Sequence, residues 1–339
     1  MRYLITGAAG FLGANLSLRL LEEGQEVIGL DNMSTGSNNN LARLRQHKKF
    51  EFINHDITAQ LPKIDDINYV YNLACPASPP RYQKDPIQTF RTSVWGIWNL
   101  ISLARNARIP IFHTSTSEVY GDPLVHPQDE GYWGNVNPIG VRACYDEGKR
   151  GAEALLMDYH RQTKNPIKIV RIFNTYGPCM DPKDGRVISN FLTQAIGQKP
   201  LTIYGDGRQS RSFCYVDDLI DGMVKMEKSP EGFLGPVNLG NPDEFTLLEL
   251  ADRIDEVTRR KNKREFLPLP KDDPKQRRPD ISLAKEKLGW QPKTKLKDGL
   301  KKTYDYFKEP SLFTKERTLG KRESISEDLK TSEDSAEDH

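Results

Sequence analysis

A glycine-rich segment near the start of the chain, YLITGAAGFLG, constrains the fold more than any other feature. It places Gly7, Gly10 and Gly13 directly after an apolar run and at the start of an amphipathic helical pattern. Glycines at such a turn let the backbone approach a dinucleotide pyrophosphate, and the helix N-terminus adds amide donors and a positive dipole end. The spacing alone is common, but the strand before it and the helix after it favour a dinucleotide-binding βαβ unit.

The first half of the chain alternates short apolar runs with helical patterns. We expect helices at residues 11–22 and 89–106, and buried strands at YLIT, EVIGLD, FEFINHD, YVYNLA and IFHTSTS. Such alternation implies right-handed crossovers and a parallel sheet covered on both faces. The predicted fold class is therefore α/β, with a Rossmann-type doubly wound parallel sheet in residues 1–173.

The amino-acid composition changes after about Asn174, where Pro, Gly and Asp become frequent. We expect residues 174–314 to form mainly a smaller C-terminal substrate-binding lobe, with segments at about 210–240 returning to the dinucleotide domain. Residues 315–339 are rich in Ser, Glu, Asp, Lys and Thr, and such a segment cannot offset its ordering entropy by burial. We expect a disordered, solvated tail there, with a regulatory or partner-binding role as the alternative.

Composition argues against several classes of function. The formal net charge of +2 gives no field that favours nucleic acid or an anionic membrane. No apolar run approaches the roughly 20 residues of a membrane span, and the chain begins almost directly with a strand, so we expect a cytoplasmic protein. The cysteines form no CxxC pair, which favours reduced thiols and no metal site; they are Cys75, Cys144, Cys179 and Cys214.

Acidic residues at two strand ends indicate which dinucleotide binds. Asp31 ends the second predicted strand, about 20 residues beyond the glycines, where a carboxylate accepts hydrogen bonds from the adenosine ribose. Asn32 and Met33 follow, with no Arg or Lys to neutralise a 2′-phosphate, so NAD is favoured over NADP. Asp56 ends the third strand and is a candidate adenine contact. The alternative for Asp31 is an ordinary polar strand end.

Two further groups of residues indicate chemistry. Tyr145 and Lys149 are four residues apart in a helical segment, so both side chains project from one face. A tyrosine has an ordinary pKa near 10, and a nearby lysine ammonium lowers it and makes the phenolate a usable base. One strand earlier, residues 114–118 gather hydroxyls and Glu118 at the carboxyl end of the fifth strand, where ligands bind in open α/β sheets. The alternatives are a surface Tyr–Lys pair and ordinary turn chemistry.

Together these features resemble the extended short-chain dehydrogenases, and longer motifs are similar to the UDP-glucuronate decarboxylases, also called UDP-xylose synthases. The similarity covers about residues 1–307 and rests on ACPASPPRYQKDPIQTF, STSEVYGDPLVHPQDEGYWGNVNPIGVRACYDEGKR, RIFNTYGP, DGRVISNFLTQA, YGDGRQSRSF, VNLGNPDE and DDPKQRRPDI. The chain departs from the family pattern at three positions. Ser93 stands where relatives usually have Asn, and Ile97 and Ser210 stand where they have Thr.

The resemblance implies an enzyme that oxidises C4 of UDP-glucuronate, loses carbon dioxide and returns the hydride to give UDP-xylose. Tyr145, assisted by Lys149, would take the C4 hydroxyl proton, and Thr116 would hydrogen-bond the same oxygen. Glu118 and Arg277 would steer the carboxylate and ring and support protonation of C5. Ser117 stands where sugar-nucleotide 4,6-dehydratases carry an acidic Asp, which argues against dehydration.

The resemblance also implies the contacts to each ligand. For NAD they are Gly7, Gly10, Phe11, Leu12, Gly13, Asp31, Asn32, Thr35, Gly36, Asp56, Ile57, Leu73, Ala74, Tyr145, Lys149 and Phe173. For the UDP-sugar they are Arg91, Ser117, Asn174, Arg186, Tyr204, Arg211 and Arg277. Arginine suits a diphosphate because its planar fork makes paired, charged hydrogen bonds.

The sequence leaves some alternatives open. By resemblance, the apolar faces of residues 93–107 and 145–163 would form the four-helix interface of a homodimer. The enzyme could instead release a UDP-4-keto-pentose together with NADH, or act as another 4,6-dehydratase or 4-epimerase. A hypothesis of a different functional class is that the protein is a catalytically silent nucleotide-binding scaffold.

Overall fold

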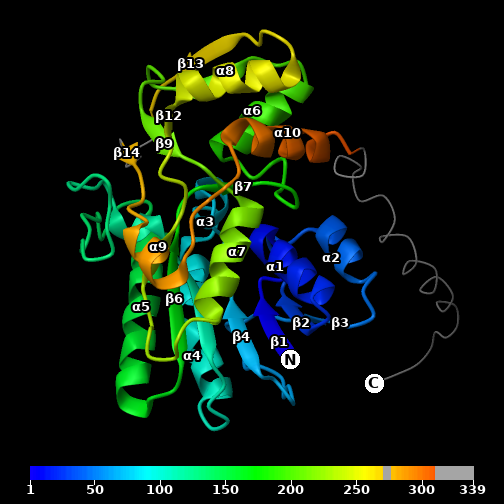
Figure 1. The fold of residues 1–339 in the computed structure, drawn as a ribbon, viewed down its shortest axis with the longest axis vertical. Coiled ribbons are helices and arrows are strands. Elements are labelled where there is room, and N and C mark those ends of the chain that lie inside the picture. Colours follow the sequence, from blue (N-terminus) through cyan, green and yellow to red (C-terminus); the bar gives the residue numbers. More distant parts are fainter. Residues whose placement is uncertain (270–275, 310–339) are drawn as a thin grey trace, which may run out of the picture.

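A parallel sheet forms the centre of the fold in a computed structural model (Figure 1). The structure describes residues 1–269 and 276–309, and within them seven strands pair in the order β11-β6-β5-β4-β1-β2-β3. The strands are β1 (Arg2–Thr6), β2 (Glu26–Asp31), β3 (Phe50–Asn54), β4 (Tyr69–Asn72), β5 (Ile111–Thr116), β6 (Ile167–Ile172) and β11 (Val237–Leu239). Every neighbouring pair is parallel, which confirms the predicted α/β fold class.

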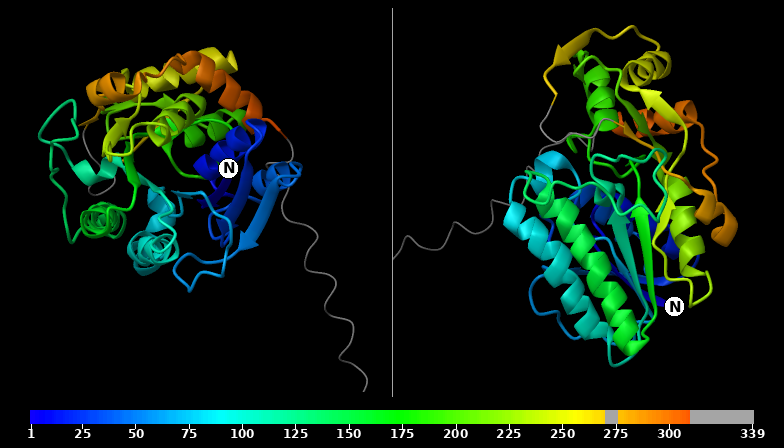
Figure 2. Two further views of the ribbon diagram at one scale, coloured as in Figure 1. Left: turned by 60° about the horizontal axis from the view of Figure 1, so that its bottom comes forward. Right: turned by 90° about the vertical axis from the view of Figure 1, so that its left-hand side faces the viewer.

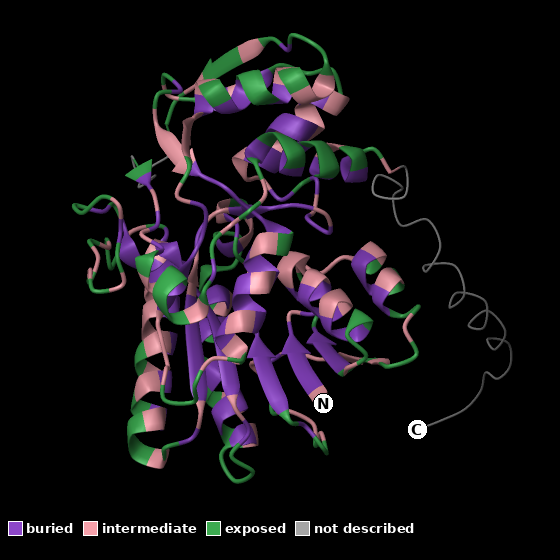
Figure 3. Cartoon of the chain, viewed as in Figure 1, coloured by how far each residue is buried: buried purple, intermediate pink, exposed green. Residues whose placement is uncertain are grey.

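Central strands are buried on both faces because helices cover the sheet on each side (Figure 3). The side chains of β1, β4 and β5 are mostly apolar or carry hydroxyls, and all of them except Arg2 are buried. The prediction of a buried strand is wrong for FEFINHD. β3 lies at the edge of the sheet, its residues are half-buried or exposed, and it ends at Asn54.

Two helical layers pack on the sheet. Leu4 points toward one face, where α4 (Pro86–Ala104) and α5 (Ala143–Thr163) lie side by side (Figure 2). Tyr3 and Ile5 point toward the other face, against α1 (Phe11–Glu22) and α7 (Val216–Glu227), with α2 (Asn38–Leu44) beside α1. This period of two follows from the alternation of side chains along a strand.

Local sequence determines where several helices begin. Asp85 accepts a hydrogen bond from the Gln88 backbone N–H at 3.0 Å, and Pro86 occupies the first turn of α4, where its missing N–H has no consequence. Thr246 and Glu249 form a reciprocal capping box at the start of α8 (Leu247–Thr258). Such caps satisfy backbone donors that have no partner within the helix.

A smaller lobe lies above the carboxyl ends of the strands (Figure 1). It contains α6 (Val187–Ile196), α8 and α10 (Leu296–Phe307), with the paired strands β8 (Leu201–Tyr204) and β13 (Arg264–Leu267). Short strands β9 (Ser210–Ser212), β12 (Glu244–Thr246) and β14 (Gln276–Arg277) form a second small sheet, and β7 (Thr175–Tyr176) pairs with β10 (Cys214–Tyr215). The remaining elements are α3 (Pro79–Tyr82), the 3-10 helix η1 (Ser117–Tyr120) and α9 (Ser282–Leu288).

The chain passes between the lobe and the sheet more than once. After β7, α6 and β8 in the lobe, it returns to the sheet through α7 and β11, and then re-enters the lobe at β12. The expected tail at 315–339 lies outside the described residues. In the described part of the chain, no helix combines the length and apolar character that crossing a membrane requires.

Trp290 offers a test of how the C-terminal segment is held on the sheet. Its side chain is buried against Gly222 of α7 and donates from Nε1 to the Asp218 carbonyl at 2.9 Å. Trp290→Ala should lower the free energy of unfolding by about 3–5 kcal/mol, because a large cavity is left. Trp133→Ala is the control, since Trp133 is 88% exposed, and it should change stability by less than about 0.5 kcal/mol. Urea denaturation measures both, and equal effects would contradict the packing described.

Candidate active site

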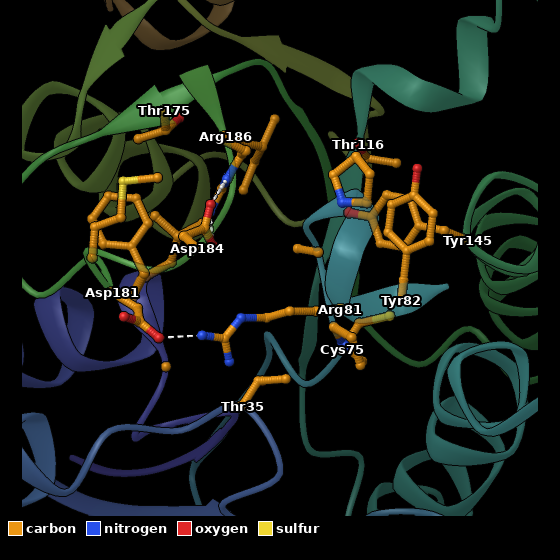
Figure 4. Close-up of a pocket in the computed structure, with 18 of the residues that line it drawn as sticks. Thr35, Cys75, Arg81, Tyr82, Thr116, Tyr145, Thr175, Asp181, Asp184 and Arg186 are labelled. Carbon is orange, nitrogen blue, oxygen red and sulfur yellow. Dashed lines mark hydrogen bonds and ion pairs between the residues drawn. The ribbon is translucent and has the colours of Figure 1, made fainter. Parts of the chain in front are cut away.

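A cavity of about 520 Å³ opens between the carboxyl ends of the strands and the smaller lobe (Figure 4). Most of the residues expected to bind ligands line it. They are Gly7, Gly10, Phe11, Leu12, Gly13, Asp31, Asn32, Thr35, Ile57, Leu73, Ala74, Thr116, Ser117, Glu118, Tyr145, Lys149, Phe173, Asn174, Arg186, Tyr204, Arg211 and Arg277.

The glycine turn at one end of the cavity has no space for side chains. Gly7 has a φ of +70°, and a Cβ there would lie 2.8 Å from the Leu73 carbonyl oxygen. A Cβ on Gly13 would lie 2.0 Å from the Gly7 carbonyl oxygen. The turn leads directly into α1, whose first amides point out of the helix N-terminus. This geometry fits a dinucleotide pyrophosphate.

Asp31 stands next to the glycine turn at the end of β2. Its carboxylate accepts hydrogen bonds from the backbone N–H groups of Ala9 at 3.0 Å and Met33 at 2.8 Å, while burial raises its pKa. Asn32 donates to the Asp56 carboxylate at 2.9 Å. These hydrogen bonds fix a carboxylate at the place where a ribose hydroxyl would donate to it.

The carboxyl end of β5 brings three of the expected residues into the cavity. Thr116 ends the strand, and its side-chain oxygen accepts a hydrogen bond from the Glu118 backbone N–H at 3.2 Å. Ser117 and Glu118 form the first turn of η1. Ser115 also lines the cavity, and it donates to Glu153 of α5 at 2.5 Å. The end of β5 and the start of η1 therefore place Thr116, Ser117 and Glu118 together at the cavity.

Tyr145 and Lys149 lie one turn apart on α5, and both are buried. Lys149 Nζ donates to the Thr114 carbonyl at 2.7 Å. The expected lowering of the Tyr145 pKa is not found. Burial raises the pKa of Tyr145, and the hydrogen bond with Thr116 and the positive charge of Arg186 lower it by less. Burial also lowers the pKa of Lys149.

Glu118 is the centre of a buried charge cluster. It pairs with Arg277 through Oε1 and with Arg142 through Oε2, the latter at 2.5 Å. Burial alone would raise the pKa of Glu118, but the guanidinium groups of Arg277 and then Arg142 overcome it and lower the pKa to about 2. The carboxylate is therefore ionised at neutral pH. Asp146, which is also buried, belongs to the same cluster, because its carboxyl interacts electrostatically with Glu118, Arg142 and Arg277.

Sequence reasoning missed two residues of this site, Arg142 and Tyr82. Arg142 precedes Tyr145 by three residues, about one helical turn, so the spacing contained a signal for it. Tyr82 of α3 stacks on Tyr145 with ring centroids 5.0 Å apart and planes within 3°. Its buried hydroxyl has no hydrogen-bond partner among the described residues. No spacing in the sequence relates Tyr82 to Tyr145, because tertiary packing brings them together.

The lobe supplies the opposite wall of the cavity. Asn174 follows β6, Tyr204 ends β8 and Arg211 lies in β9. Arg186 precedes α6 and is held by Asp184, from Nε to Oδ2 at 2.5 Å and from Nη2 to Oδ1 at 3.1 Å. A fixed arginine at this wall suits a phosphate group.

Three expected contacts are absent from the described residues that line the cavity: Arg91, Gly36 and Asp56. Arg91 is exposed, because α4 is turned so that Thr92 and Ser93 are the buried side chains. Gly36 packs behind Asp31, where its Cβ would lie 3.1 Å from Oδ1. Asp56 is engaged by Asn32 and by the Gln88 amide at 3.2 Å.

Comparison with known proteins identifies the family to which the chain belongs. The sequence profile of the GDP-mannose 4,6 dehydratase family matches residues 4–303. UDP-glucuronic acid decarboxylase 3 of Arabidopsis thaliana is 52% identical over 301 residues, which cover 88% of this chain and 87% of the relative. UDP-glucuronic acid decarboxylase 1 of Danio rerio is 48% identical over 306 residues, covering 90% and 72%. The chain belongs to the UDP-glucuronic acid decarboxylase family.

Solved structures outside the decarboxylases share the same fold. UDP-glucuronic acid 4-epimerase from Bacillus cereus, in complex with UDP-glucuronic acid and NAD, aligns with a TM-score of 0.81 at 30% identity, covering 91% of this chain and 99% of the other. UDP-glucose 4-epimerase from Thermotoga maritima, with UDP-glucose, aligns with a TM-score of 0.82 at 28% identity, covering 91% and 98%. The decarboxylase family therefore shares its architecture with epimerases that bind UDP-sugars.

The affinity for NAD tests the role of the glycine turn. Gly13→Ala should weaken NAD binding by about fivefold to a hundredfold, since overpacking against the Gly7 carbonyl costs about 1–3 kcal/mol. Gly232→Ala is the matched control, because a Cβ there meets nothing within 4 Å. Isothermal titration of each purified variant with NAD measures the effect. Equal affinities of the two variants would show that the turn does not approach the dinucleotide.

Proposed function

We propose that this chain is an NAD-dependent decarboxylase that converts UDP-glucuronate to UDP-xylose. The observation that carries the proposal is the pair of arginines around Glu118, next to the Tyr145 side chain and inside one cavity. Guanidinium groups at this place suit a sugar that carries a carboxylate, because they make paired, charged hydrogen bonds with it. The identity of about half of all residues to UDP-glucuronic acid decarboxylases supports the same substrate and reaction.

NAD is the proposed cofactor. The glycine turn, Asp31 and the uncharged Asn32 after it support NAD over NADP. Two structures of UDP-glucuronic acid 4-epimerase from Bacillus cereus that share this fold are complexes with NAD. When bound, NAD supplies the redox chemistry, accepting hydride from C4 of the sugar and later giving it back.

Tyr145 is the proposed base for the C4 hydroxyl. Because burial raises the pKa of this phenol, its ionised form needs donors and positive charge close by. The hydrogen bond with Thr116 and the guanidinium of Arg186 act in that direction. Lys149, one turn along α5, is the proposed partner for proton exchange. The same Tyr145 hydroxyl would return the proton to the C4 oxygen in the last step.

Arg277 and Arg142 are proposed to hold the sugar carboxylate after C4 has become a ketone. The carboxylate is then β to the carbonyl, so the electrons of the breaking C–C bond delocalise onto the carbonyl oxygen as carbon dioxide leaves. Glu118, with a pKa of about 2, is a poor proton donor at neutral pH. Its support for protonation of C5 is therefore indirect, through the placement of the arginines.

Ser117 supports decarboxylation over dehydration. A 4,6-dehydratase needs an acid to expel the C6 hydroxyl, and the serine at this place in the cavity cannot serve as one at neutral pH. A glucuronate has no C6 hydroxyl to lose. Incubation of the protein with UDP-glucuronate and NAD, with products identified by mass spectrometry and NMR, tests the proposal. UDP-xylose and carbon dioxide are expected; recovery of a 4-epimer or of unchanged substrate would refute it.

A homodimer in the cytoplasm is the proposed working form. The outward face of α4 carries Trp95 and Trp98, which are 52% and 56% exposed. Together with Val94, also of α4, and Leu155 of α5, they border a shallow apolar hollow. Such a face is suited to pairing with the same face of a second chain.

Tyr145→Phe tests the base. Removing the hydroxyl should reduce turnover by about 10² to 10⁴, the usual contribution of a general acid–base group. Tyr304→Phe on α10, which does not border the cavity, is the control and should retain wild-type turnover. Steady-state assays and circular dichroism are measured together. A loss smaller than about tenfold in a folded Tyr145→Phe variant would exclude Tyr145 as the base.

Glu118→Gln tests the division of labour between the two chemical steps. Without its charge the arginines lose their shared partner, so decarboxylation should slow more than the first hydride transfer. Reduced nicotinamide and the 4-keto acid should then accumulate transiently, and absorbance after rapid mixing with UDP-glucuronate detects them. If the variant slows both steps to the same extent, Glu118 does not act selectively on decarboxylation.

A further inference from the structure

One loop lines the cavity and contacts helices on two sides of it. We call residues 178–186, between β7 and α6, the strap. Its first residues are tied to the dinucleotide side of the cavity. Asn15 of α1 donates to the Pro178 carbonyl at 3.0 Å, and Asn40 of α2 donates to the Cys179 carbonyl at 3.0 Å.

The strap meets α3 on the other side at two points. Arg81 of α3 forms an ion pair with Asp181, and Figure 4 shows its side chain reaching across the cavity from the side of Cys75 and Tyr82. Gly185 packs against Pro80, and a Cβ on Gly185 would lie 2.8 Å from the Pro80 Cγ. Both Arg81 and Asp181 line the cavity.

Hydrogen bonds within the strap orient the Asp181 carboxylate for this contact. Asp181 Oδ1 accepts from the Lys183 backbone N–H at 2.8 Å, and the Asp181 carbonyl accepts from the Asp184 N–H at 2.9 Å. These bonds leave Oδ2 for Arg81. Asp184 in turn holds Arg186 at the substrate wall. The ion pair therefore joins a fixed carboxylate on the strap to the segment that also carries Tyr82, the residue stacked on Tyr145.

We propose that the Arg81–Asp181 pair closes the strap over the reduced cofactor and so determines which product leaves the enzyme. The inference rests on the proposed function. Oxidation of C4 and loss of carbon dioxide together turn UDP-glucuronate and NAD⁺ into UDP-4-keto-pentose, carbon dioxide and NADH. Transfer of hydride from NADH to C4 and of one proton to the C4 oxygen then gives UDP-xylose and NAD⁺. If NADH leaves before that transfer, the keto sugar is released instead.

Hydride return to C4 competes with the release of NADH, and the strap affects the outcome through the rate at which NADH dissociates. The ion pair is half-buried, with side-chain exposures of 26% and 38%, so water screens it only in part. Removing it should raise the dissociation rate constant of NADH by about threefold to tenfold. The share of UDP-4-keto-pentose among the products should rise in parallel. The residues proposed for the hydride transfer are unchanged in these variants.

A rival assignment gives Arg81 a direct role as a phosphate ligand. The two assignments differ for the aspartate. If the pair is a strap, Asp181→Asn opens it and NADH dissociates faster. If Arg81 binds the pyrophosphate, Asp181→Asn frees the guanidinium for that role and NADH dissociates more slowly or at the wild-type rate.

The experiment compares Arg81→Met, Asp181→Asn and the charge-reversed double variant Arg81→Asp with Asp181→Arg. Protein loaded with NADH is mixed rapidly with excess NAD, and the change in nicotinamide fluorescence gives the dissociation rate constant without turnover. Product ratios after incubation with UDP-glucuronate and NAD are measured by mass spectrometry. Arg253→Met, which removes an exposed ion pair to Glu256 on α8, is the control.

Faster NADH release and more keto sugar in both single variants, with partial recovery in the double variant, are the expected results. Wild-type dissociation rates in both single variants overturn the strap, and so does slower release from Asp181→Asn. Melting temperatures identify any variant that fails to fold, and the isosteric Asp181→Asn then decides alone. If the wild-type protein makes neither pentose, the proposed function fails, yet the NADH dissociation rates still test the strap.

Discussion

Because every strand of the central sheet runs parallel to its neighbours, their carboxyl ends meet at one edge, and the site depends on this constraint. The glycine turn after β1, Asp31 at the end of β2, Thr116 at the end of β5 and Asn174 after β6 all reach the cavity from that edge. None of them is near the others in sequence. The direction of the strands therefore converts separate strand ends into one binding surface.

A second constraint comes from burying Glu118. An ionised carboxylate in the interior is tolerated only when charged partners surround it. Its partners come from distant parts of the chain: Arg142 precedes α5, and Arg277 belongs to β14 of the lobe. The charge cluster consequently links the lobe to the carboxyl end of the sheet. Loss of either arginine would leave the carboxylate partly uncompensated.

Patterns within one element could be read from the sequence, and contacts between elements could not. Apolar runs predicted the strands and the fold class, and spacing predicted the glycine turn and the shared face of Tyr145 and Lys149. The burial of β3 was mispredicted, since its composition does not reveal that it lies at the edge of the sheet. Arg91 faces solvent because the packing of α4 sets its rotation. The raised pKa of Tyr145 and the Arg81–Asp181 pair depend on burial and on tertiary contacts that no local pattern encodes.

The return of α7 and β11 to the sheet has a consequence for how such a chain can be divided. A fragment that stops after β6 would lack β11, the edge neighbour of that strand, and would uncover the apolar surface that α7 protects. Unpaired strand edges with exposed apolar surface promote aggregation. The two lobes thus share an interwoven chain. Exchanging the substrate-binding part between relatives would require moving two separate segments together while leaving the helix and strand between them in place.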